Sequence, residues 1–291
     1  MDWSQQQQLA KKAALEAERM RRFVRVLNYA PVDPFDTAIK CGCDVRFVSL
    51  PSLEGVYSPE PKPAIVIGSE RPSGRRAYTC AHELGHHVFK HGAQVDELNA
   101  QKHACQRTPE EFIADTFAGF FLMSQIAVSR ALKDRKLLAS SLQPEQIYRM
   151  ANYFGVGYST IVSHFAYSLR IITRDHADNL LKIKPKSIKD QYGADVKTEV
   201  VIVDHNWQHR AVDLESGDTL VLPENAKVDP GQQLQFSEKR AGCTIYKAAS
   251  VGLSRAYLNE TEWAVNIRVS RKNYEGLARF RYLEDDEEES D

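Results

Sequence analysis

Residues 77–91 read AYTCAHELGHHVFKH, and this stretch decides how the rest of the chain is interpreted. His82 and His86 stand four positions apart, so on a helix they project from one face, one turn from each other. Two imidazoles in that arrangement can reach the same tetrahedral cation, and neutral imidazole suits Zn²⁺. Glu83 would flank such an ion without binding it, where it can accept a proton from an ion-bound water. This is the H-E-x-x-H pattern of metallopeptidases.

A catalytic zinc ion normally has three protein ligands and one open position, so a third ligand must come from elsewhere. Residues 109–123 predict a second amphipathic helix, on which Glu111 and Asp115 share a face. We expect Glu111 to bind the metal and Asp115 to accept the spare ring N–H of a ligand histidine. Glu110 is the main rival for the ligand role. The alternative is that these acidic side chains only favour a helix N-terminus.

Taken together, the two segments resemble the ImmA/IrrE family of zinc peptidases. The resemblance rests on Arg75–His86 (RRAYTCAHELGH) and on the E-x-x-A-x-x-F-A pattern that begins at Glu111. It extends over the strand patterns that precede them and covers about residues 34–165.

The resemblance implies a gluzincin-like zinc metalloendopeptidase, with His82, His86 and Glu111 as zinc ligands and Glu83 as the general base. Members of the family typically cleave helix-turn-helix transcriptional repressors. The resemblance therefore implies a site-specific enzyme whose protein partner is such a repressor. Cleavage would induce a stress, DNA-damage or phage-defence response.

The pattern along the chain predicts an α+β protein of several parts. An N-terminal helix is expected over 1–30, followed over 31–181 by a zincin-like peptidase domain with a helical bundle and a small sheet. The basic, proline-containing stretch 182–196 is predicted to be a linker. Alternating β-branched and aromatic residues over 197–283 predict a β-rich sensor or regulatory domain, which the resemblance suggests is GAF-like. Residues 284–291 carry seven acidic side chains and are predicted to be disordered.

Cys105 lies in the loop predicted between the two metal-binding helices, close to Lys102, His103 and Arg107. A thiolate is an excellent zinc ligand, and neighbouring cations favour the thiolate. We therefore regard Cys105 as a candidate inhibitory fourth ligand, with an incidental loop thiol as the alternative. His103 is a weaker candidate for stabilising an oxyanion.

Other conspicuous residues are interpreted as structural. His87 and His91 lie off the predicted metal face, which favours surface or packing roles. Residues 143–165 predict a helix, a turn and a second helix. That second helix offers almost no side chain suited to reading base edges, so we assign the segment to the helical bundle.

Composition narrows the class of protein further. No run of about 18 apolar residues is present, which excludes an integral membrane protein. The sequence from Met1 has no apolar signal-peptide core, and the five cysteines are an odd number, so we expect a cytoplasmic protein with reduced thiols.

Two other functions stay open at this stage. Cationic and aromatic side chains are interleaved in Arg268–Tyr274 and at Arg281-Tyr282, a pattern that could suit single-stranded nucleic acid as an effector; a small ligand is the other candidate effector. The alternative function is therefore a nucleic-acid- or ligand-binding regulator whose zinc site is not catalytic. A zinc hydrolase that acts on a small amide is the third possibility.

Overall fold

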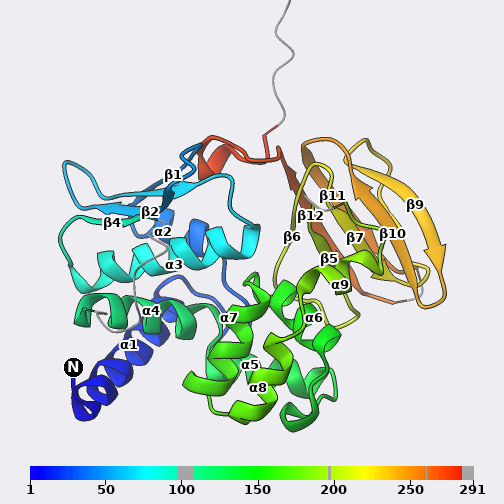
Figure 1. Cartoon of the computed structure of the whole chain (residues 1–291). Helices are drawn as coiled ribbons and strands as arrows, with labels where there is room; N and C mark the ends of the chain where they lie inside the picture. The colour runs from blue at the N-terminus through cyan, green and yellow to red at the C-terminus, as the bar shows by residue number, and fades with distance from the viewer. Residues whose placement is uncertain (98–107, 196–197, 260, 284–291) are drawn as a thin grey trace, which may run out of the picture.

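The computed structural model of the 291-residue chain describes residues 1–97, 108–195, 198–259 and 261–283. It is a mixed α+β protein, as the sequence predicts. Figure 1 shows a half built of helices and one sheet, and a β-rich half beside it. The α-helices are α1 (Trp3–Phe23), α2 (Pro34–Lys40), α3 (Ser73–Phe89), α4 (Pro109–Leu122), α5 (Gln125–Asp134), α6 (Pro144–Phe154), α7 (Tyr158–Ser163), α8 (Arg174–Leu181) and α9 (Pro185–Asp190).

The first half contains a five-stranded sheet. Its spatial order is β13 (Gly276–Leu277), β1 (Asp44–Val48), β3 (Ala64–Gly68), β2 (Leu53–Ser58) and β4 (Gln94–Glu97). Strands β1 and β3 are parallel, and the remaining pairs are antiparallel. In Figure 1 helix α3 lies beneath this sheet, with α4 beneath α3 and α1 beneath α4. The sheet therefore covers the helix that carries the H-E-x-x-H pattern.

Strand β13 changes the predicted division of the chain. It follows the β-rich half in sequence, yet Phe47 of β1 pairs with Gly276 of β13. A short helix, η4 (Ala278–Phe280), follows directly. Residues 276–280 therefore lie with the first sheet, whereas the sequence pattern placed everything up to residue 283 in the β-rich part. The alternating pattern predicts a strand but cannot indicate which sheet that strand joins.

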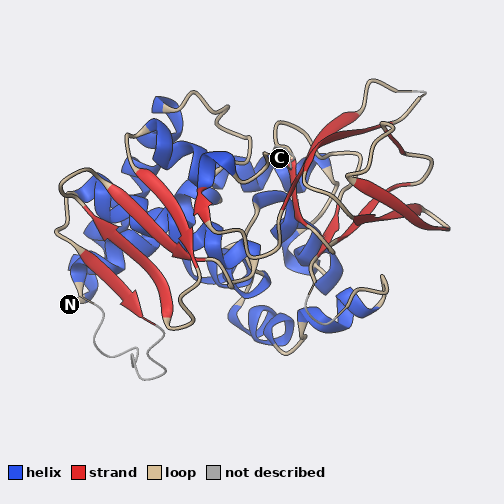
Figure 2. Cartoon of the chain, turned by 90° about the horizontal axis from the view of Figure 1, so that it is seen from above, coloured by secondary structure: helices blue, strands red, loops and turns tan. Residues whose placement is uncertain are grey.

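The β-rich half consists of two four-stranded sheets, which Figure 2 shows beside the five-stranded sheet as seen from above. The first sheet has the order β5 (Val200–Ile202), β7 (Thr219–Pro223), β10 (Cys243–Ala248) and β9 (Leu234–Arg240). The second has the order β6 (Val212–Glu215), β12 (Ala264–Ser270), β11 (Gly252–Tyr257) and β8 (Lys227–Val228). Buried apolar residues from both sheets join one core. This two-sheet arrangement does not by itself identify a GAF-like fold.

Helix α1 is shorter than the apolar spacing predicts. It begins at a capping box between Asp2 and Gln5 and ends at Phe23, because Arg25 adopts a left-handed backbone with φ of 58°. The buried guanidinium of Arg21 holds the chain that follows: it donates to the carbonyls of Asn28 and Ala30. These bonds hold residues 28 and 30 close to Arg21, so residues 24–30 do not continue the helix.

Two further segments bear on the predictions. The stretch 182–196, predicted to be a linker, contains helix α9, whose Ile188 is buried.

The stretch Pro109–Asp134 is long and apolar enough to cross a membrane by length and composition, but 61% of its most apolar window is buried. Such burial is typical of a core helix in a folded domain, and Ser124 caps a new helix, α5, in the middle of the stretch.

Candidate metal centre

Helix α3 presents its two histidines on one face, as their spacing predicts. His82 and His86 are both buried. The opposite face of the helix is held by Cys80, Ala81 and Leu84, which are fully buried in the apolar core. Cys80 is not a member of the candidate ligand group, and burial raises the pKa of its thiol well above the ordinary value.

Helix α4 brings Glu111 to the two histidines. The hydroxyl of Thr108 accepts the backbone N–H of Glu111 and fixes the first turn of α4 at this point. Oε2 of Glu111 lies 3.4 Å from Nε2 of His82, and its Oε1 lies 3.6 Å from Nε2 of His86. The two Nε2 atoms are 3.0 Å apart. Glu110, the rival in the sequence, does not belong to this group.

These separations fit a tetrahedral zinc ion. Zinc holds imidazole nitrogen and carboxylate oxygen at about 2.1 Å, which places any two ligand atoms of a tetrahedron about 3.4 Å apart. The three contacts of the group cluster around that value, and all the ligand atoms lie within 4.8 Å of one another. Two neutral imidazoles and one carboxylate also match the ligand types of catalytic zinc sites.

The close crossing of α3 and α4 depends on Gly85. A Cβ atom added at Gly85 would lie 3.1 Å from Cα of Ala114 and 3.2 Å from the ring of Phe117. Any larger side chain would push α4 away from α3. Glycine at position 85 and alanine at 114 therefore let Glu111 approach the histidines from the next helix.

Asp115, which was predicted to orient the first ligand histidine, contacts that histidine in the structure. Oδ1 of Asp115 lies 3.0 Å from Nδ1 of His82, which leaves Nε2 of this ring directed at Glu111. The backbone carbonyl of Asp115 accepts the hydroxyl of Tyr78. A carboxylate on the second nitrogen of a ligand histidine fixes the ring orientation and tautomer.

His91 contacts the second ligand histidine, and its position differs from the sequence prediction. Helix α3 ends at Phe89, and Lys90 adopts a left-handed backbone with φ of 56°. The chain therefore turns back, and Nδ1 of His91 lies 2.8 Å from Nδ1 of His86. The sequence interpretation placed His91 opposite His82 because it assumed a continuous helix. Its neighbour His87 does lie away from the group, with Nδ1 3.1 Å from the hydroxyl of Tyr57.

Glu83 is fully buried between α3 and strand β2. A Cβ at Gly55 of β2 would lie 2.4 Å from Oε1 of Glu83, so only glycine leaves room for this carboxylate. Glu83 is not a member of the His-His-Glu group. The role of Glu83 as general base stays a prediction.

Two other predictions have different outcomes. Cys105 and His103 lie outside the described residues, so the inhibitory-ligand hypothesis stays a prediction.

Helices α6 and α7 form the predicted helix-turn-helix around Gly155, and their apolar faces are buried in the core. Tyr148 of α6 donates its hydroxyl to the carbonyl of Val200 in the β-rich half, which ties α6 into the protein interior.

The fold and the site together define an α+β protein with a candidate metal centre between two crossed helices. Residues 40–164 match the family model of the IrrE N-terminal-like domain, the peptidase domain of the ImmA/IrrE family. The resemblance seen in the sequence is therefore confirmed. The family is of metallopeptidase type and is generally zinc-dependent.

Solved structures and curated proteins add little to this assignment. A transcriptional regulator of Mycobacterium tuberculosis is 18% identical, with a TM-score of 0.37, over 54% of this chain and 46% of its own length. The chain thus spans less than half of that regulator. A cysteine protease inhibitor of Entamoeba histolytica is 10% identical, with a TM-score of 0.19, over 25% of this chain and 94% of its own. Among curated proteins, none matches the chain.

Proposed function

We propose that this protein is a zinc-dependent endopeptidase that cleaves a helix-turn-helix transcriptional repressor. The observation that carries the proposal is the spacing of the ligand atoms of His82, His86 and Glu111, which fits one tetrahedral ion. The family match supports peptide hydrolysis as the reaction. A zincin-like core, a repressor as substrate and a role in a stress response are parts of this proposal.

The residues divide the chemistry between them. Bound by His82, His86 and Glu111, zinc would polarise the scissile carbonyl and make a bound water more acidic. Glu83 would serve as the general base, which takes a proton from the attacking water and returns it to the leaving amine. Asp115 holds the ring of His82 in the orientation that binds metal.

The sheet suggests how a peptide would reach this site. Among the described strands β4 ends the five-stranded sheet, and it pairs antiparallel with β2, the strand that contacts Glu83. A free sheet edge offers unpaired backbone groups to an extended peptide. We therefore propose that an unfolded linker of the repressor binds along β4 as an added strand.

The test compares the wild type with Glu83→Gln. Each protein is expressed in the native host, and new protein N-termini are mapped by mass spectrometry. A fragment of a helix-turn-helix repressor should appear with the wild type and be reduced about 10²- to 10⁴-fold with Glu83→Gln, since the general base is lost. Zinc content, measured by atomic absorption, should be unchanged.

Matched variants separate ligand loss from loss of the base. Glu111→Gln should lose zinc, whereas Glu110→Gln, one position away on the same helix, should keep it. If Glu83→Gln generates the same repressor fragment at the wild-type rate, the peptidase proposal fails. A Glu83→Gln protein that also retains full biological function would instead favour the regulator with a non-catalytic zinc site.

A further inference from the structure

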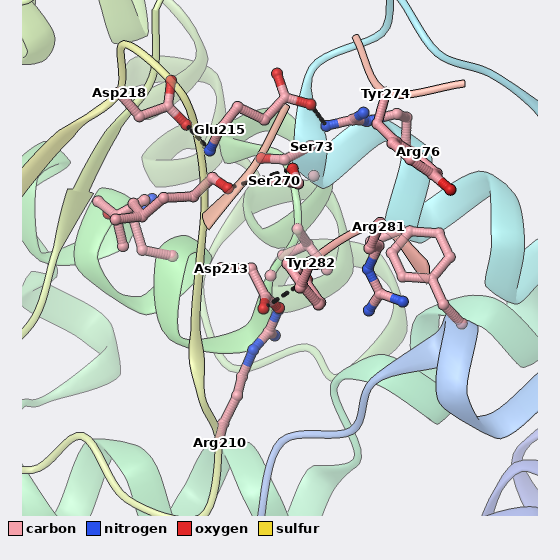
Figure 3. A pocket seen from close by; sticks show the side chains of 18 of the residues that line it. Ser73, Arg76, Arg210, Asp213, Glu215, Asp218, Ser270, Tyr274, Arg281 and Tyr282 are labelled. Atoms are coloured by element: carbon pink, nitrogen blue, oxygen red, sulfur yellow. Dashed lines mark hydrogen bonds and ion pairs between the residues drawn. The ribbon is translucent and has the colours of Figure 1, made fainter. Parts of the chain in front are cut away.

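A cavity of about 90 Å³ lies where the two halves of the chain meet, and it contains none of the candidate metal ligands (Figure 3). Its walls come from the first turn of α3, the end of α6, the residues around β6 and the segment around Tyr282. The lining residues are buried or partly buried except for Ser73, which is exposed. We take Ser73 to mark the opening of the cavity.

The carboxylates that line the cavity are already engaged. Asp213 accepts two bonds from Arg268, of 2.6 and 3.0 Å, and one of 2.7 Å from the hydroxyl of Tyr282. Asp218 accepts backbone N–H groups on both of its oxygens, at 2.8 Å each. Glu215 forms an ion pair with Arg76. The acceptor groups of the wall therefore have little capacity left for a ligand.

Arg210 is different, because the contacts of its guanidinium with the described part of the chain are long. Nη1 lies 3.5 Å from the carbonyl of Tyr153, and Nη2 lies 3.6 Å from Oδ2 of Asp213. The side chain is only 12% exposed, while its backbone carbonyl accepts the indole N–H of the buried Trp207. A guanidinium has five N–H donors. Among the described residues, the cavity thus holds a fixed cation whose guanidinium donors have only these two long contacts.

The charge of the wall adds to this. Burial raises the pKa of Asp218 to about 7, so near neutral pH this carboxyl is only partly ionised. Of the three lining arginines, Arg76 pairs with Glu215 and Arg281 pairs with Asp33, whereas Arg210 has the long contact of 3.6 Å with Asp213. What the wall lacks is an anionic acceptor.

We infer that this cavity is a binding site for a small organic anion, a short carboxylate or the phosphate of a phosphate monoester, held by the guanidinium of Arg210. The oxyanion supplies the acceptors that Arg210 lacks, in the charge-assisted geometry that guanidinium favours. Phe47, Val156 and Trp207 give the rest of the wall an apolar surface. An apolar cavity of about 150 Å³ holds benzene, so the enclosed part of the ligand is smaller than a benzene ring.

The position of the cavity gives its occupant a path to the metal centre. Arg76 and Ala77 line the cavity from α3, and His82 lies about 9 Å further along the same helix. An anion on Arg210 would also strengthen the contact between the β-rich half and the first turn of α3. The site is separate from the metal group, so its test does not depend on peptidase activity.

The experiment measures binding of butyrate, inorganic phosphate and AMP to the full chain by isothermal titration calorimetry. At least one of them should bind saturably in the millimolar range or below. Butyrate as the tighter ligand would indicate a carboxylate, and AMP or phosphate a phosphate monoester. Butyramide, which has the shape of butyrate without its charge, should not bind.

Two variants place the bound probe in this cavity. Arg210→Gln should weaken binding at least tenfold, while Arg130→Gln, which changes an exposed arginine of α5, should leave it unchanged. Ser73→Trp should block the opening and abolish binding with no change in thermal stability, because residue 73 is exposed. The inference is overturned if none of the probes binds at concentrations up to about 50 mM, which is 50-fold above a dissociation constant of about 1 mM. It is also overturned if Arg210→Gln and Ser73→Trp both bind as tightly as the wild type.

Discussion

At the residue scale, the two candidate ligand histidines have different partners on their second ring nitrogen. His82 faces the carboxylate of Asp115, whereas His86 faces the imidazole of His91. Burial lowers the pKa of His91 from its ordinary value, while the nearby Glu110 and Glu111 act in the opposite direction. A neutral His91 can accept the Nδ1–H of His86, and Nε2 of His86 then carries no proton, as a metal ligand requires.

We predict that His91→Ala weakens zinc binding about 10- to 100-fold, the usual cost of losing a partner that orients a metal ligand. The measurement is competition with a chromophoric chelator. His87→Ala is the matched control: it removes a histidine of the same helix that contacts Tyr57 instead of the metal group, and should bind zinc as the wild type does. Equal zinc affinity for His91→Ala and the wild type would rule out this role for His91.

The residues of the centre were predictable to the extent that helix geometry is rigid. The spacing of His82 and His86, and of Glu111 and Asp115, places each pair on one helix face, and the structure brings the four together. His91 could not be predicted, because its contact depends on the left-handed backbone of Lys90, and lysine gives no signal for that conformation. The presence of Gly85 is explained only once the crossing with α4 is known.

At the scale of elements, one buried histidine fixes the end of α4. The ring of His164, in the π-helical turn η3 (His164–Ser168), contacts Gly119, where a Cβ would lie 2.9 Å from its Nδ1. Its Nε2 lies 2.9 Å from the carbonyl of Met123, the C-cap residue of α4. Burial lowers the pKa of His164 to about 4. The folded protein therefore keeps this ring neutral at pH values where the unfolded chain protonates it.

This depressed pKa predicts acid sensitivity. Between pH 6.5 and 4 the unfolded state binds a proton at His164 that the folded state does not bind. The free energy of unfolding therefore decreases as the pH falls below 6.5. The loss approaches about 3 kcal/mol. His164→Gln keeps a donor for the Met123 carbonyl but cannot titrate. Urea unfolding at pH 7 and pH 4 should show a smaller decrease for this variant, and identical decreases would contradict the assignment.

Element boundaries were less predictable than the elements themselves. The apolar patterns locate β1, β2 and β3, since each strand is a short apolar run between turn residues. The end of α1 was missed because the carbonyls that Arg21 binds lie beyond the helix, and no local pattern shows that contact. Helix α9 was read as a linker because its one buried apolar residue, Ile188, is surrounded by lysines.

At the scale of the whole molecule, ion pairs join the two halves. Asp33 caps α2 by accepting the backbone N–H of Phe35, and it also binds Arg268 of β12 and Arg281 at distances of 2.9 and 3.1 Å. Arg268 reaches Asp213 as well. Although burial opposes ionisation, Arg268 holds the pKa of Asp213 at about 2. The start of the first half is thus connected to the β-rich half through one guanidinium.

Arg268→Met should therefore destabilise the whole protein by about 3 kcal/mol, because it leaves Asp33 and Asp213 partly buried without their shared cation. Arg255→Met, on the neighbouring strand β11, changes an exposed arginine and should cost less than about 0.5 kcal/mol. Chemical denaturation followed by circular dichroism provides both values. Comparable losses in the two variants would show that the ion pairs contribute little.

Strand β13 has a consequence for synthesis on the ribosome. Phe47 and Gly276 are separated by most of the polypeptide, so their pairing must wait until nearly all of it has been translated. Until then one side of β1 exposes open hydrogen-bonding groups, a template onto which another nascent chain can add. The arrival of β13 then covers the backbone of β1 at Arg46 and Phe47.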